Sequence, residues 1–255
     1  MKLFFFFLIL ASLESSAQTL CQRIEGGISN YLEDSTSRIN FKNHGGLLNG
    51  GVCWWHSRLQ RSSAYLVEFE PKMSIPTSEE AIKILKKIKA MKSVVVIPGF
   101  EDFNSFTNFF SKEVQQFLEA WQREDGFLNQ QWLRGISGRS ELSSDDMIAR
   151  MDILYAQFQN SPTPVWIMAQ IKGVSSHAFL ILDMKTVANG YALRLIDSNH
   201  PLDTRLLNYE RGQKFLKHVK ENYSFVPYFG FKKDSLNLQM VIRKYCYLTK
   251  ILSDD

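Results

Sequence analysis

The spacing of apolar residues changes near Pro162 and Pro164, and this change constrains the fold more than any other feature of the chain. Before the two prolines, apolar residues recur every three or four positions, as in amphipathic helices. After them come short apolar runs typical of strands, at 165–171, 177–184 and 191–196. Asn189-Gly190 between the last two runs predicts a hairpin turn. Helices followed by a sheet predict an α+β fold.

Several helices are predicted in the first part of the chain. Trp55, Leu59, Ser62, Leu66 and Phe69 share one helical face and predict a helix of about four turns that begins near Cys53. Thr77 or Ser78, followed by two glutamates, is typical of a helix start. The remaining predicted elements are a helix over 77–91, a strand over 94–97, helices over 105–121 and 143–158, and a strand or helix in 225–252.

The first residues are typical of a secretory signal peptide. Lys2 precedes an apolar run over 3–13, and small residues follow at 15–17. We therefore expect a signal peptide at 1–17, a single domain over 18–255, and a secreted or periplasmic protein. The run is shorter than the about 20 residues that span a bilayer, and no later run reaches that length, so we expect no stable membrane anchor once the signal is removed.

Three cysteines remain after residue 17, namely Cys21, Cys53 and Cys246. An odd number in an exported monomer leaves at least one unpaired. A Cys21–Cys246 disulfide would join the two ends of the domain and leave Cys53 free, although other pairings stay open at this stage.

Composition and motifs argue against several classes of partner. The formal net charge is only +4, and no basic run is interleaved with aromatic residues, so no nucleic-acid partner is expected. His56 forms a C-x-x-H pair with Cys53, but no second ligand pair has zinc spacing, so we expect no metal. Gly50-Gly51 is not followed by a phosphate-binding pattern, and no cofactor is expected. We expect a monomer.

The residues around Cys53 and in the hairpin suggest acyl-transfer chemistry. A cysteine at a helix N-terminus gains stability as a thiolate from exposed backbone N–H groups and the helix dipole. His177 begins one strand of the predicted hairpin, and Asp197 ends the next. Antiparallel pairing brings these positions together, so Asp197 can orient the imidazole of His177 as a general base. The alternatives for Cys53 are a half-cystine, a zinc ligand or a buried thiol.

The segments "GVCWW", "SSHAFLI" and "LIDSNHP", in that order, resemble the papain-like cysteine peptidase superfamily. The glycine two residues before the cysteine and "DSN" are closer to secreted bacterial effector cysteine proteases with G-x-C and D-x-N motifs. The resemblance implies a papain-like fold, with the nucleophile on a central helix and the other two catalytic residues on a following antiparallel sheet. It also implies a Cys53, His177, Asp197 triad that acts on a peptide or protein substrate.

An oxyanion hole would combine the backbone N–H of Cys53 with a side-chain amide that precedes it in the sequence. Papain-type enzymes have a glutamine six residues before the cysteine, where this chain has Leu47. Asn49 is the first candidate for a side-chain donor and Asn43 the second. Asn199 is the alternative to Asp197 as the residue that orients the imidazole, although turn stabilisation is its simpler role.

Three functions fit these residues. The first is a thiol hydrolase, a cysteine peptidase working through a thioester acyl-enzyme. The second is an acyl transferase of the transglutaminase type, which uses the same constellation with an amine acceptor. The third is a secreted binding protein that retains the scaffold without activity, because a fold does not fix a function.

Overall fold

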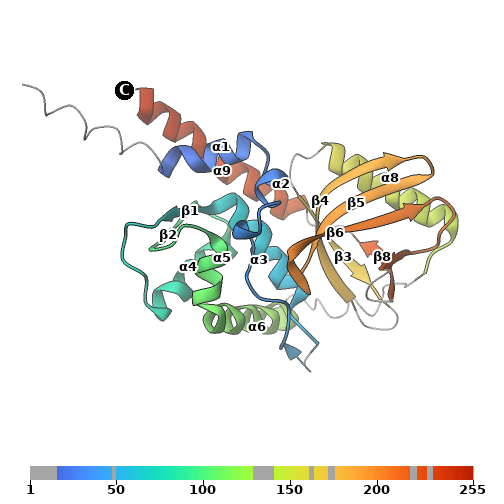
Figure 1. The fold of residues 1–255 in the computed structure, drawn as a ribbon, viewed down its shortest axis with the longest axis horizontal. Coiled ribbons are helices and arrows are strands. Elements are labelled where there is room, and N and C mark those ends of the chain that lie inside the picture. The colour runs from blue at the N-terminus through green and yellow to red at the C-terminus, as the bar shows by residue number, and fades with distance from the viewer. Residues whose placement is uncertain are drawn as a thin grey trace, which may run out of the picture.

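The computed structural model describes residues 16–47, 50–128, 141–160, 164–171, 176–218, 223–228 and 232–254. These residues form a helical half and a sheet half that lie side by side, with α3 at the junction (Figure 1). The architecture is a mixture of helices and a mainly antiparallel sheet, as the order of apolar patterns predicts. The predicted signal peptide at 1–17 lies almost wholly outside the described residues.

The helical half contains α1 to α6 and α9, and the sheet half contains α8 and β3 to β8. The helices are α1 (Ser16–Glu25), α2 (Ile28–Tyr31), the 3-10 helix η1 (Ser35–Ser37), α3 (Cys53–Leu66), α4 (Ser78–Ala90), α5 (Phe103–Phe109), α6 (Ser111–Leu128), α8 (Ser144–Asn160) and α9 (Lys232–Asp254). The strands are β1 (Val67–Glu70), β2 (Val95–Pro98), β3 (Val165–Gln170), β4 (Ser176–Val187), β5 (Gly190–Asp197), β6 (His200–Glu210), β7 (Leu216–His218) and β8 (Tyr223–Tyr228).

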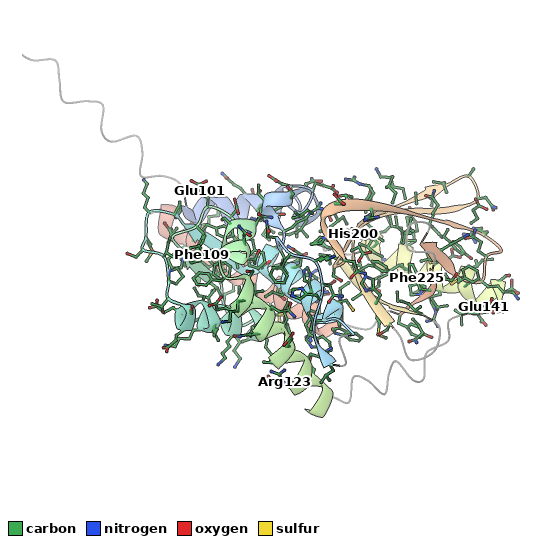
Figure 2. The ribbon with its side chains drawn as sticks, turned by 60° about the horizontal axis from the view of Figure 1, so that its bottom comes forward. Glu101, Phe109, Arg123, Glu141, His200 and Phe225 are labelled. Atoms are coloured by element: carbon green, nitrogen blue, oxygen red, sulfur yellow. A yellow bond between two sulfur atoms is a disulfide. The ribbon has the colours of Figure 1, made fainter. Side chains whose placement is uncertain are left out.

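The large sheet has strand order β6-β5-β4-β3-β8-β7, and its end strands approach each other, so the sheet is nearly closed. Its central strands are buried on both faces. Residues 166, 168, 178, 180 and 182 join the core of the helical half, whereas 165, 167, 169, 179 and 181 join a second core under α8. Phe225 lies in the second core, and Figure 2 shows it among the strands, far from Phe109 in the helical half.

Most predicted elements form, and the differences have identifiable causes. Thr77 begins α4 with a reciprocal capping box to Glu80. The helix that begins at Cys53 ends at Leu66 rather than at Phe69, because the next four residues pair as β1 with β2 in parallel. The predicted single helix over 105–121 is wrong, since α5 and α6 meet at Phe110. In the tail both alternatives occur, as β8 and α9.

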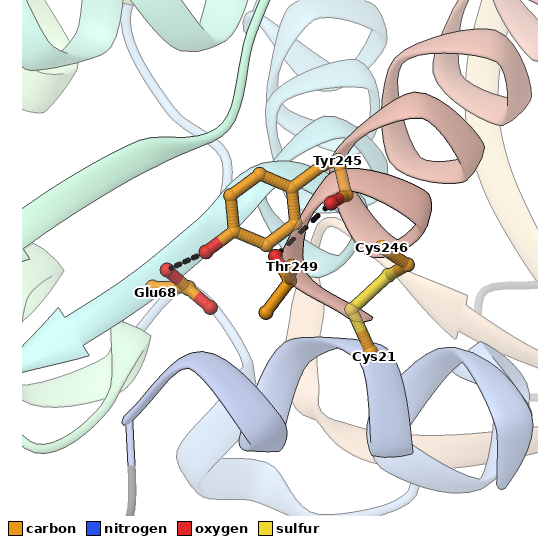
Figure 3. Close-up of a disulfide and its surroundings, with 5 residues drawn as sticks. All are labelled: Cys21, Glu68, Tyr245, Cys246 and Thr249. Atoms are coloured by element: carbon orange, nitrogen blue, oxygen red, sulfur yellow. Dashed lines mark hydrogen bonds between the residues drawn. A yellow bond between two sulfur atoms is a disulfide. The ribbon is translucent and has the colours of Figure 1, made fainter. Parts of the chain in front are cut away.

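A disulfide and a side-chain hydrogen bond attach helix α9 to the helical half (Figure 3). Cys21 of α1 and Cys246 of α9 form a disulfide with their Cα atoms 5.7 Å apart, and Cys53 is a free cysteine. The hydroxyl of Tyr245 donates to Glu68 of β1 over 2.7 Å, and burial together with this carboxylate raises the pKa of Tyr245 to about 12. Among the described residues, no helix is long and apolar enough to cross a membrane.

A buried group of charges joins α3 to α6 and α9. The Arg58 guanidinium lies 3.3 Å from the Asp125 carboxylate and 2.8 Å from that of Asp234. Trp55 donates its indole N–H over 2.8 Å to Oδ2 of Asp125, the oxygen that also faces Arg58. Because breaking a buried ion pair leaves a charge uncompensated, these contacts hold the three helices in one arrangement.

Removal of the disulfide should lower stability without changing the fold. For Cys21→Ser/Cys246→Ser we expect the free energy of unfolding to fall by about 2–5 kcal/mol, because the bond closes a very long loop in the unfolded chain. Urea denaturation measures the change. Cys53→Ser is the control and should keep the midpoint of the native protein. Equal midpoints for the oxidised and reduced native protein would contradict this prediction.

Candidate active site

Cys53 is the first residue of α3, so its side chain lies at the positive end of a fourteen-residue helix. Val52 is the N-cap residue and makes no side-chain capping bond. Gly51 turns the chain into the helix with a φ of 83°, where a Cβ would come within 2.5 Å of Asn43 Nδ2. The glycine is therefore needed both for its backbone conformation and for the close approach of Asn43. This local sequence places Cys53 beside the exposed backbone N–H groups of the first helical turn.

His177 and Asp197 meet across the β4–β5 hairpin. His177 is the second residue of β4, Asp197 is the last residue of β5, and the strand register pairs Asp197 with Phe179. The Nε2 atom of His177 lies 2.6 Å from Oδ1 of Asp197, and both side chains are buried. A carboxylate only accepts, so Nε2–H donates and the other ring nitrogen, Nδ1, is left for a second partner.

The packing of α3 against β4 places Cys53 close to the imidazole of His177. Cys53 Sγ lies 4.0 Å from the carbonyl oxygen of Ser176, the residue before His177. Burial lowers the pKa of His177, but the hydrogen bond with Asp197 and the nearby Cys53 thiol outweigh burial and raise it to about 10. The imidazole is therefore protonated at neutral pH and carries its positive charge beside the sulfur.

No family model, curated protein or solved structure matches this chain. The function has to be inferred from the geometry of the three residues and of the groups around them.

Asp197 is itself held by the turn that follows it. Its Oδ1 atom accepts from the backbone N–H of Asn199 over 2.8 Å as well as from His177. The side chain of Asn199 points elsewhere and accepts from Asn43 Nδ2 over 3.2 Å. Asp197 therefore holds the imidazole, and the alternative orienter, Asn199, supports the carboxylate through its backbone.

Asn43 bonds to both sides of the candidate site. Its Oδ1 atom accepts from the backbone N–H of Val52 over 2.5 Å, next to the nucleophile. Its own backbone N–H donates to the carbonyl of Ser198 over 2.7 Å, next to the carboxylate. The sequence suggested Asn43 only as an oxyanion donor, and no local pattern indicates this bridging role. Asn49, the first oxyanion candidate, lies outside the described residues.

His56 lies one turn after Cys53, but its chemistry differs from that of His177. Its ring is buried, and Nε2 donates to the carbonyl of Phe41 over 3.0 Å. Burial lowers the pKa of His56 to about 4, despite the opposing effects of the Phe41 bond and of the Asp197 charge. His56 is therefore neutral near pH 7 and holds a loop in place. Trp54 packs edge-on against Trp166 with ring centres 4.7 Å apart, as expected for core residues.

A cavity of about 640 Å³ lies between the segment 33–35 and strand β6. It is lined by Glu33, Asp34, Ser35, Leu202, Asp203, Thr204 and Arg205. Cys53, His177 and Asp197 do not line it, so we assign it no part in the chemistry of the thiol.

The contact between thiol and imidazole can be tested by alkylation with iodoacetamide. In the native protein we expect fast alkylation of Cys53 at about pH 6, because the charged imidazole of His177 stabilises the thiolate. In His177→Ala the rate at this pH should fall by at least about tenfold and recover only near pH 8.5, where an ordinary thiol ionises. Only Cys53 can react, since the other two cysteines are bonded to each other.

The matched control is His44→Ala, which removes an exposed histidine whose Nδ1 contacts the Lys42 carbonyl. Its pH profile should overlay that of the native protein. If His177→Ala also overlaid the native profile, the thiol would be ionised by something other than this imidazole.

Proposed function

We propose that this chain is a secreted thiol hydrolase of papain-like fold, a cysteine peptidase in which Cys53, His177 and Asp197 form the catalytic triad. The observation that carries the proposal is the buried His177–Asp197 pair, 2.6 Å apart, together with the Cys53 thiol at the start of α3, which is close enough to raise the pKa of the imidazole. A nucleophile, a base and a residue that orients the base are the minimal parts of covalent acyl transfer.

Each part has a role that its surroundings support. The Cys53 thiolate attacks the carbonyl carbon of the substrate, and the backbone N–H of Cys53 donates to the oxyanion that forms. The C–N bond then breaks while the His177 imidazolium gives its proton to the leaving amine. The imidazole next takes a proton from water, the resulting hydroxide attacks the thioester, and the C–S bond breaks. This step releases the acid and restores the thiolate and imidazolium.

The proposed location outside the cytoplasm has two kinds of support. The first residues have the pattern of a signal peptide, and the chain contains a disulfide between Cys21 and Cys246. Structural disulfides persist in oxidising compartments and are rare in the cytosol of most organisms. The substrate we propose is a peptide or protein, because the triad resembles that of peptidases.

Product analysis tests the reaction class directly. We expect the exported protein to produce new peptide ends in a mixture of unfolded proteins, measured by mass spectrometry, and Cys53→Ala to produce none. The same incubation with a labelled primary amine should give little labelled product, because water is the proposed acceptor. Labelled adducts without new peptide ends would replace the peptidase by an acyl transferase of the transglutaminase type. If neither product formed although Cys53 could be fully alkylated, an inactive binding protein would be favoured.

Asn43 has a separate prediction that distinguishes positioning from oxyanion binding. Loss of the Val52 and Asn199 bonds in Asn43→Ala should misalign the thiol and the imidazole, so kcat should fall by about 100-fold. Alkylation of Cys53 at about pH 6 should fall with it, because the thiolate depends on the same alignment. Asn40→Ala is the control, since that side chain bonds Asn104 instead. A fall in kcat with unchanged alkylation would identify Asn43 as an oxyanion donor.

A further inference from the structure

The outward face of α9 carries a row of exposed apolar side chains. They are Leu236, Met240, Tyr247, Leu248 and Ile251, with exposed fractions between 43% and 67%. Their spacing of about four and seven residues places them on one side of the helix. On the opposite side, Leu238 and Ile242 are buried in the body of the protein. A row of this length on a single helix is unusual, because exposed apolar residues are normally scattered.

The contacts described above fix this face in its outward orientation. The disulfide through Cys246, the bond from Tyr245 to Glu68 and the ion pair between Asp234 and Arg58 all attach the inner side of α9. Figure 1 shows α9 at the margin of the helical half beside α1, with the C-terminal end pointing away from the rest of the molecule. The apolar row is therefore open to solvent on the outer side of the helix, and we call it the ridge.

The charged residues over 235–251 are all basic. Arg243, Lys244 and Lys250 are exposed, and at 100° per residue they lie beside or between the apolar positions. Residues 235–251 contain no aspartate or glutamate. The one acidic residue at the start of the helix, Asp234, lies on the inner side and is bonded to Arg58. The outward face is therefore apolar and cationic.

We propose that this ridge of α9, residues 236–251, binds the surface of a lipid bilayer that contains anionic lipids. A flat membrane surface accommodates a convex helix, with apolar side chains entering the boundary between headgroups and acyl chains. A tyrosine is well suited to that boundary, because its ring is apolar and its hydroxyl remains in contact with water. The long cationic side chains extend along the helix and place their charges among anionic headgroups.

Charge complementarity favours a bilayer over a second copy of the chain. Two copies of α9 packed ridge to ridge in an antiparallel pair would bring Arg243 and Lys244 of both copies together near the middle. Residues 235–251 contain no acidic side chain to compensate them. An anionic membrane supplies negative charge along the whole length of the ridge, so the same cations strengthen binding.

Vesicle sedimentation tests the proposal with the exported protein, its disulfide intact. We expect the protein to sediment with vesicles of phosphatidylcholine and phosphatidylglycerol in a three-to-one ratio, and much less with phosphatidylcholine alone. High salt should weaken the binding. For Met240→Gln/Tyr247→Gln the partition coefficient should fall by about tenfold or more, since two apolar side chains no longer enter the bilayer. For Arg243→Gln/Lys244→Gln the preference for the anionic vesicles should decrease.

The control is Leu206→Gln, which removes an exposed apolar side chain on β6 and should bind like the native protein. Urea denaturation shows that each variant is folded, and this control does not depend on the proposed peptidase activity. Failure of the native protein to sediment with anionic vesicles at low salt would overturn the proposal. So would unchanged binding of Met240→Gln/Tyr247→Gln, or a concentration-dependent dimer that this variant abolishes.

Discussion

The packing of α3 between the two halves of the molecule is the constraint on which the rest depends. Almost every residue from Trp54 to Leu66 is buried, so the helix is enclosed on all sides rather than on one face. Its polar side chains therefore need partners inside the protein. Gln60 accepts from the N–H of Ile39 and donates to the carbonyl of Ser37, and Arg58 bonds to Asp125 and Asp234. These bonds allow only one position of the helix, and that position places Cys53 against His177.

The position of the imidazole between an acid and a thiol explains how a buried histidine keeps a proton. Burial alone would make it neutral, as it does for His56 only one helical turn from the thiol. His177 differs because Asp197 bonds to its ring and the nearby Cys53 thiol also favours the charged imidazole. In a site shielded from water, these charge-assisted bonds are stronger than they would be at the surface. The same sequence thus contains a neutral histidine with a structural role and a charged one suited to catalysis.

Much of the candidate site could be predicted from the sequence because it depends on local pattern. The turn at Ala188-Asn189, just before Gly190, and the flanking apolar runs determine the hairpin, and the hairpin brings His177 to Asp197. Strand β1, which forms by pairing with a distant segment, could not be predicted. The apolar period of α3 continues through Phe69, and only the parallel partner at Val95–Pro98 makes that residue part of a strand. The strand that begins at His200 could not be predicted either. The residues "DSNHP" indicate a turn, but only Ser198 and Asn199 form it, and the strand starts directly after them.

The segment 37–43 holds the helical half and the sheet half, which have separate cores, in a fixed position relative to each other. Residues 37, 39 and 41 bond to Gln60 and His56 of α3 through their backbone. Arg38 also bonds to Thr204, and Asn43 to Ser198 and Asn199, all in the sheet half. One short segment therefore bonds to both halves. Because the contact between Cys53 and His177 crosses the same boundary, the geometry of the site is set by this segment as much as by the three residues themselves.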